Sequence, residues 1–114
     1  MSLQGTAREI DGVTVVDLSG RVTLGENSAF LRKTIRDLLS NGRTKIVLNL
    51  ADVDYIDSAG IGELVSAFTT TRNHGGELKL LHLAKRVRDL LQITRLYTVF
   101  DVHSDEKTAA SSFR

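Results

Sequence analysis

Cysteine is absent from the 114-residue sequence. Its absence excludes disulfide scaffolds, thiol catalysis, iron–sulfur clusters and zinc sites with cysteine ligands. The three histidines, His74, His82 and His103, are far apart in the sequence and do not show the spacing of metal ligands. We therefore expect the protein to hold no metal ion and no cofactor of its own.

The sequence also lacks a large excess of charge of one sign and a long apolar run. Lysine and arginine number 15, aspartate and glutamate number 14, and the net charge is +1. A nucleic-acid-binding domain usually has a clear basic excess, and a membrane-spanning helix needs about 20 apolar residues. The first residues do not form the hydrophobic region of a signal peptide. We predict a cytoplasmic protein that neither binds nucleic acid nor inserts directly into a membrane.

What the sequence does contain is the composition of one globular domain, with 41% hydrophobic and 25% charged residues. Runs of β-branched and other apolar residues predict strands, and apolar residues at helical spacing predict helices. Asp11-Gly12 predicts a hairpin turn, and a loop is expected over residues 20–25. The predicted strands cover residues 7–10, 13–19, 45–50, 78–83 and 99–102; the predicted helices cover residues 28–40, 84–94 and 105–114, and a further one begins near Ser58 and ends at Gly75-Gly76.

This alternation of strands and helices predicts an α/β fold. We expect a mixed, mostly parallel central sheet of four to five strands with three to four helices packed on it. The nearly continuous apolar run over residues 45–50 is typical of a strand that is covered on both faces. Functional groups in such folds usually lie where strands end and helices begin. The segment that follows Leu50 is therefore the first place to look for a site.

That segment, ADVDYIDSAGIGE over residues 51–63, contains four acidic residues and no basic one, a local charge of −4. Ser58 stands where the loop becomes a helix, and its position favours a role as the N-cap. A phosphate on Ser58 would also suit the positive end of the helix dipole. Because it would add about −1.5 to −2 charge to an acidic surface, it would change how a partner binds without changing the fold.

Two glycines, Gly60 and Gly62, fall in the first turns of the same helix. Glycine in a helix interior costs up to about 1 kcal/mol relative to alanine, so a helix selected for stability alone would not contain both. Glycine allows another backbone or a partner to approach closely. The sequence leaves two interpretations open: tight packing on a neighbouring element, or a surface on which a partner docks.

The run Asp57-Ser58-Ala59-Gly60-Ile61-Gly62 resembles the signature D-S-x-G-aliphatic-G of anti-sigma factor antagonists, which are STAS domains. The resemblance extends over essentially the whole chain and implies a STAS domain over residues 4–114. It implies a bacterial phosphoprotein that regulates transcription by partner switching and is not an enzyme.

The family mechanism that the resemblance implies runs through two partners. The unphosphorylated antagonist binds an anti-sigma factor, commonly a GHKL-type serine kinase, and frees the sigma factor. The kinase uses its ATP to phosphorylate the signature serine and the pair dissociates, after which a metal-dependent serine phosphatase restores the active form. Carried over by position, Ser58 is the phosphoacceptor. The implied partner-binding residues are Asp57, Ala59, Gly60, Ile61, Gly62 and Thr23.

Thr23 is a departure from the family pattern. Many relatives have an acidic residue at this point, in a Gly-x-aliphatic-Asp pattern, where this chain has Gly20-Arg21-Val22-Thr23. The loop is expected to flank the phosphoacceptor, so the change bears on phosphorylation and on the identity of the kinase.

An alternative role follows from the same resemblance. The chain would then be a STAS subunit of a larger machine, such as the cytoplasmic component of a lipid-transport ABC complex or a stress-signalling scaffold. In that role Ser58 would never be phosphorylated.

Enzymatic interpretations fail on particular residues. A serine hydrolase elbow needs G-x-S-x-G, but Ile56 occupies the place of the first glycine. A dinucleotide site needs G-x-G-x-x-G, but Val65 stands where the third glycine is required. A response-regulator receiver needs an acidic pair after its first strand, and the early strand offers only Asp17.

A basic stretch over residues 85–95 has a net charge of +3. It is either the solvated face of the third helix or a second contact surface for an acidic partner.

Overall fold

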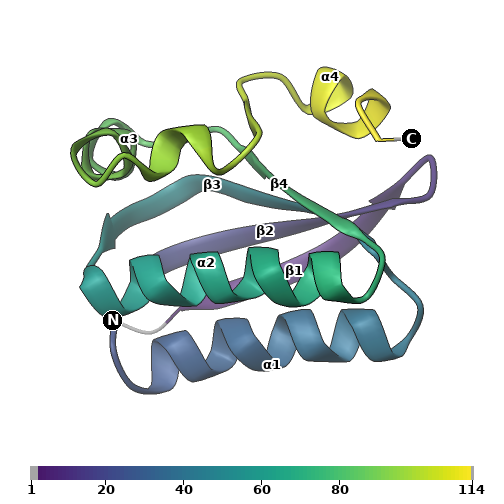
Figure 1. The fold of residues 1–114 in the computed structure, drawn as a ribbon, viewed down its shortest axis with the longest axis horizontal. Helices are drawn as coiled ribbons and strands as arrows, with labels where there is room; N and C mark the ends of the chain where they lie inside the picture. Colours follow the sequence, from purple (N-terminus) through teal and green to yellow (C-terminus); the bar gives the residue numbers. More distant parts are fainter. Residues whose placement is uncertain (1–2, 114) are drawn as a thin grey trace.

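A computed structural model describes residues 3–113. These residues form one sheet of five strands and four α-helices, with a short 3-10 helix, η1, before the last strand. The elements are β1 (Gln4–Ile10), β2 (Val13–Val22), α1 (Glu26–Ser40), β3 (Lys45–Ile56), α2 (Ser58–Asn73), β4 (Glu77–Leu81), α3 (Lys85–Ile93), η1 (Leu96–Thr98), β5 (Val102–His103) and α4 (Glu106–Ser111) (Figure 1).

The strands lie side by side in the order of the sequence. β1 and β2 are antiparallel, and every later pair is parallel. The predicted hairpin turn is confirmed: Asp11 and Gly12 both have positive φ, 50° and 82°, as the tight turn between two twisted strands requires. The predicted α/β class with a mixed, mostly parallel sheet is therefore confirmed.

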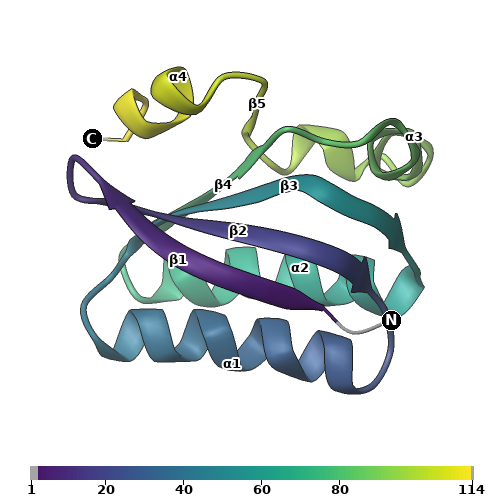
Figure 2. The same ribbon diagram turned by 180° about the vertical axis from the view of Figure 1, so that it is seen from behind.

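The helices form layers on the two faces of the sheet. α1 and α2 lie together against one face, and α3 and α4 lie on the other (Figures 1 and 2). Alternate residues of a strand explain this arrangement, because Val16 and Leu18 of β2 belong to the core under α1 and α2, whereas Val13 and Val15 pack with Ala109 of α4. Burial of one such aliphatic side chain contributes roughly 1.5–3 kcal/mol.

β2 and β3 run further than the sequence indicated. They stay paired to Val22 and Ile56, past two irregularities in register, so residues 20–22 and 51–56 are strand where loops were expected. In β3 the side chains of Val53 and Ile56 are buried, while Asp52 is exposed. Asp52 and Asp54 therefore lie on an extended strand, on either side of the buried Val53.

The C-terminal part also differs from the prediction. The last strand predicted over residues 99–102 exists, but its bounds were wrong: β5 contains only Val102 and His103. Phe100, outside this strand, is buried and packs edge-on against Phe68, with ring centroids 5.6 Å apart. The last helix spans only Glu106–Ser111 of the predicted 105–114, and Arg114 lies outside the described residues. The other predicted boundaries differ from the observed ones by three residues or fewer.

None of the helices formed by residues 3–113 is long and apolar enough to cross a membrane.

Candidate partner-binding site at the start of helix α2

One residue, Asp57, separates the end of β3 from the start of α2. Its backbone N–H donates to the carbonyl oxygen of Val22 at the end of β2, at 3.2 Å. The parallel pair β2 and β3 therefore ends at the point where α2 begins. The loop that leads from β2 to α1, residues 23–25, lies beside the helix start (Figure 1).

Asp57, rather than Ser58, is the N-cap of α2, so the cap predicted from position was wrong. Asp57 has the extended backbone that a cap needs, and its carboxylate accepts a hydrogen bond from the Gly60 N–H at 2.7 Å. The second carboxylate oxygen accepts from the Leu24 N–H at 3.1 Å. The hydrogen bonds from Gly60 and then Leu24 hold the pKa of Asp57 below its usual range. The Asp57 carboxylate thus links the β2–α1 loop to the first turn of α2 by hydrogen bonds to both.

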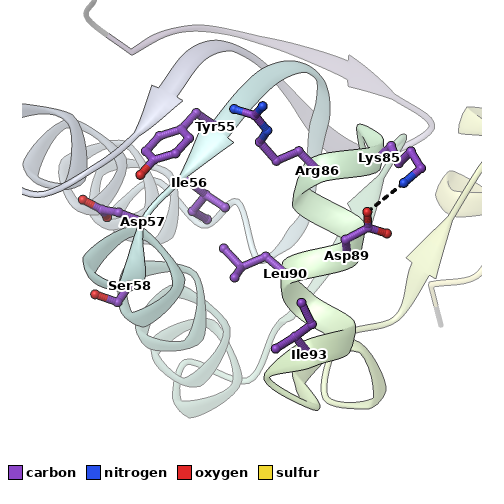
Figure 3. Close-up of a pocket in the computed structure, with 9 residues that line it drawn as sticks. All are labelled: Tyr55, Ile56, Asp57, Ser58, Lys85, Arg86, Asp89, Leu90 and Ile93. Carbon is purple, nitrogen blue, oxygen red and sulfur yellow. Dashed lines mark hydrogen bonds and ion pairs between the residues drawn. The ribbon is translucent and has the colours of Figure 1, made fainter.

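Ser58 is the first residue of α2, and its side chain is exposed. In Figure 3 its hydroxyl points away from α3, toward solvent. No hydrogen bond joins this hydroxyl to another residue of the described chain, since the capping role is taken by Asp57. The Ser58 hydroxyl is accessible to an external reactant and is held in place by the helix behind it.

The two glycines of the first turns have different surroundings. A Cβ at Gly60 would lie 2.0 Å from the carbonyl oxygen of Val22 and 2.7 Å from the side chain of Ile56. A Cβ at Gly62 would meet nothing within 4 Å, and Gly62 is exposed. Tight packing therefore explains Gly60 and leaves Gly62 unexplained by the fold.

The other predicted contact residues lie at different depths. Ile61 is only 8% exposed and belongs to the core, so it supports the site from beneath. Ala59 is half-buried. The Thr23 hydroxyl accepts a hydrogen bond from the side-chain amide of Asn27 at 2.9 Å. Thr23 lies in the loop that flanks the helix start, as expected, but its hydroxyl is hydrogen-bonded to the first turn of α1.

The acidic surface is smaller than its sequence suggested. Glu63 is 7% exposed and pairs with Arg32 of α1 at 2.8 Å, so its charge is neutralised between the two helices. Asp52 and Asp54 remain exposed on β3. The expected cluster of four negative charges is thus divided between a helix–helix contact, a helix cap and two free carboxylates.

An open groove of about 680 Å³ runs between this region and α3 (Figure 3). Its apolar lining comes from the end of β3 and from α3, and consists of Tyr55, Ile56, Leu90 and Ile93. Its charged lining consists of Asp57, Lys85, Arg86 and Asp89, beside Ser58. The sequence described residues 85–95 as a basic helix, either a solvated face or a second contact surface for an acidic partner, and did not indicate a groove. The exposed apolar Ile93 was the one signal that this helix has a second apolar side.

The groups at this site favour binding over catalysis. The polar groups of the groove are the hydroxyls of Ser58 and Tyr55, the hydrogen-bonded carboxylate of Asp57, the guanidinium of Arg86, and an ion pair between Lys85 and Asp89 at 3.0 Å. Within residues 3–113 there is no group of three or more histidine, aspartate or glutamate side chains placed to hold a metal ion.

Comparison with known proteins places these observations in one family. Residues 5–109 match the STAS domain family. A Bordetella bronchiseptica protein provisionally named anti-sigma factor antagonist BtrV is 30% identical over 96% of this chain and 93% of its own. The anti-sigma-B factor antagonist of Bacillus subtilis is 28% identical over 90% of this chain and 92% of its own. Both names describe regulators rather than enzymes.

Solved structures give the same result for the fold. A Thermotoga maritima protein, also provisionally named as an anti-sigma factor antagonist, superposes with a TM-score of 0.87. It covers 96% of this chain and 94% of its own, at 24% identity. From the site signature, the sheet order and these matches, the chain belongs to the STAS domain family.

Proposed function

We propose that this chain is an anti-sigma factor antagonist whose partner binding is switched by phosphorylation of Ser58. The observation that carries the proposal is the exposed Ser58 hydroxyl at the first position of a 16-residue helix, which Asp57 caps in its place. The names of the two curated relatives support the general role. The proposed functional unit is the domain over residues 4–114.

In the unphosphorylated state the protein binds an anti-sigma factor, and a sigma factor is freed. The anti-sigma factor is a GHKL-type serine kinase that supplies ATP. The Ser58 oxygen forms a bond to the γ-phosphorus, the bond to ADP breaks, and the hydroxyl proton passes to a base of the kinase. Gly62, about one helical turn after Ser58, and Thr23, in the loop that flanks the helix start, contact the kinase.

Phosphorylated Ser58 gains about −1.5 to −2 charge at a helix N-terminus, where the free backbone N–H groups favour an anion. The fold therefore tolerates the phosphate, while the docking surface changes in charge and bulk. The complex dissociates for this reason. A metal-dependent phosphatase hydrolyses the phosphoester and restores the binding form.

The test is an affinity capture from the native cytoplasm with wild-type, Ser58→Ala and Ser58→Asp proteins as baits. Mass spectrometry identifies the bound proteins and shows whether Ser58 carries phosphate. We expect wild type and Ser58→Ala to capture a GHKL-type kinase, Ser58→Asp to lose it, and the cellular protein to carry phosphate on Ser58. Ser66→Asp is the matched control, because it places the same charge on an exposed position two turns along α2.

Two outcomes contradict the proposal. If Ser66→Asp captures as little kinase as Ser58→Asp, added negative charge on α2 weakens binding wherever it is placed, and position 58 has no special role. If all baits capture an ABC transporter subunit equally and Ser58 is unmodified, the chain is a subunit of a larger machine.

A further inference from the structure

The groove between β3 and α3 has apolar side chains that no other part of the described chain covers. Ile93 of α3 is 78% exposed and Tyr55 of β3 is 37% exposed, and both line the groove with Leu90 (Figure 3). Single exposed apolar residues are common on protein surfaces. Here they come from two elements and share one concave surface, which is typical of a place where another chain packs.

Two arginines at this groove have no carboxylate partner in the described chain, although the lining charges of Lys85, Arg86, Asp57 and Asp89 sum to zero. Lys85 is paired with Asp89, and the carboxylate of Asp57 is occupied by two backbone N–H groups. Arg86 lines the groove and has no carboxylate partner among residues 3–113. Arg21 lies over the Tyr55 ring, 5.6 Å from its centroid, and it too has no carboxylate partner in that part of the chain.

We propose that the groove binds an acidic amphipathic segment of the partner protein. An aliphatic side chain of that segment packs against Leu90 and Ile93, and a carboxylate binds the guanidinium groups of Arg86 and Arg21. Guanidinium groups suit this role because they bind carboxylates through two parallel hydrogen bonds. That the segment belongs to the anti-sigma factor rests on the function proposed above.

This assignment gives phosphorylation a local means of releasing the partner. Ser58 lines the same groove as Arg86. A phosphate on Ser58 adds negative charge at the edge of the groove and repels the bound carboxylate. Repulsion across a partly desolvated groove is screened less than repulsion in open solvent. The partner segment then leaves the groove without a change of fold.

The experiment is a selection from a library of random peptides displayed on phage, with the unphosphorylated full chain as the target. We expect the selected peptides to combine aliphatic residues with aspartate or glutamate. Arg86→Ala and Arg86→Glu should weaken their binding at least about tenfold, the loss expected for one charge-assisted hydrogen-bonded pair. Arg88→Glu is the matched control, because Arg88 is exposed on the same helix but does not line the groove.

In a second experiment, phosphoserine is incorporated at position 58, and the affinity of the tightest-binding selected peptide is measured again. We expect weaker binding, with a difference from the unphosphorylated protein that shrinks as salt is added. Equal affinities in the two states would overturn the release mechanism.

Selection of peptides without acidic residues, equal binding to Arg86→Glu and Arg88→Glu, or no selected peptide at all would overturn the groove assignment. Because no kinase is present, this result is independent of the cellular switch. Acidic peptides that bind through Arg86, in a protein that carries no phosphate in the cell, would contradict the proposed function and leave the groove assignment intact.

Discussion

The first turn of α2 has two sides that differ in almost every contact. On the inner side, Asp57 and Gly60 are joined to the end of β2 and to the loop after it, by hydrogen bonds and by close backbone packing. On the outer side, Ser58 and Gly62 are exposed, and neither has a packing role. Within one helical turn, the groups that hold the fold together are thus separate from the exposed groups to which we assign the proposed partner binding. Substitutions on the two sides should therefore have different consequences.

The largest expected effect on stability is that of Gly60→Ala. The new methyl group would overlap the Val22 carbonyl, and a backbone atom cannot move aside as a flexible side chain can. We expect a loss of at least about 3 kcal/mol in the free energy of unfolding, the upper part of the range for overpacked sites. Urea denaturation measures it. A variant as stable as wild type would show that the helix start moves freely relative to β2.

Asp57→Ala should cause the next largest loss, because it leaves the N–H groups of Gly60 and Leu24 without their acceptor. Asp57→Asn should lose less, since asparagine is also a good N-cap. Thermal denaturation at neutral pH measures both losses. If alanine and asparagine have equal effects, the hydrogen bonds of this carboxylate do not hold the loop and the helix together.

The pH dependence of the Asp57 variants gives a separate prediction. The pKa of Asp57 is lowered in the folded protein, so its carboxylate stabilises the fold above the unfolded-state pKa of about 3.9. This stabilisation is lost as the pH falls through the lower pKa of the folded state. The stability difference between wild type and Asp57→Asn should thus be largest at neutral pH and disappear in acid. A difference that stays constant down to pH 2 would mean that the charge has no role.

The inner side of this turn also shows which features of the site could be predicted from the sequence. Helical periodicity located α2, and the signature located Ser58 and its neighbours. The cap was assigned to Ser58 because serine and aspartate are equally suitable N-caps and adjacent in the chain. They are distinguished by where the helical backbone begins: Asp57 is still extended and accepts from the Gly60 N–H, whereas Ser58 is already the first helical residue. The sequence likewise left open whether the glycines serve packing, and the answer for Gly60 depends on Val22, which is 38 residues earlier.

Contacts between distant segments account for the other errors. β2 and β3 continue to Val22 and Ile56 because each supplies the other's hydrogen bonds, which local composition does not encode. The groove was missed for the same reason, since Tyr55 and Ile93 lie on separate elements. The apolar residues near Phe100 predicted a strand, but Phe100 instead packs against the ring of Phe68 and Val99 is exposed.

On the outer side, Gly62→Ala should leave the protein as stable as wild type or more stable. Alanine is favoured over glycine in a helix interior by up to about 1 kcal/mol, and a methyl group meets no other atom here. Gly62→Gln should also fold normally but weaken binding of the captured kinase, which calorimetry measures. Equal losses of stability and affinity would mean that Gly62, like Gly60, is retained for packing.

The smallest expected effect on stability is that of Ser58→Ala. The substitution removes an exposed hydroxyl that neither caps the helix nor bonds to another described residue, so the free energy of unfolding should change by less than about 0.5 kcal/mol. Binding of the kinase should be retained, and phosphorylation should be lost. A folded Ser58→Ala protein that still accepts phosphate from the kinase would place the acceptor at another residue. If Ser58→Ala loses as much stability as Asp57→Ala, the distinction between the two sides of the turn is wrong. The exposed Ser58 hydroxyl, which bonds to no other described residue, would then be stabilising the fold.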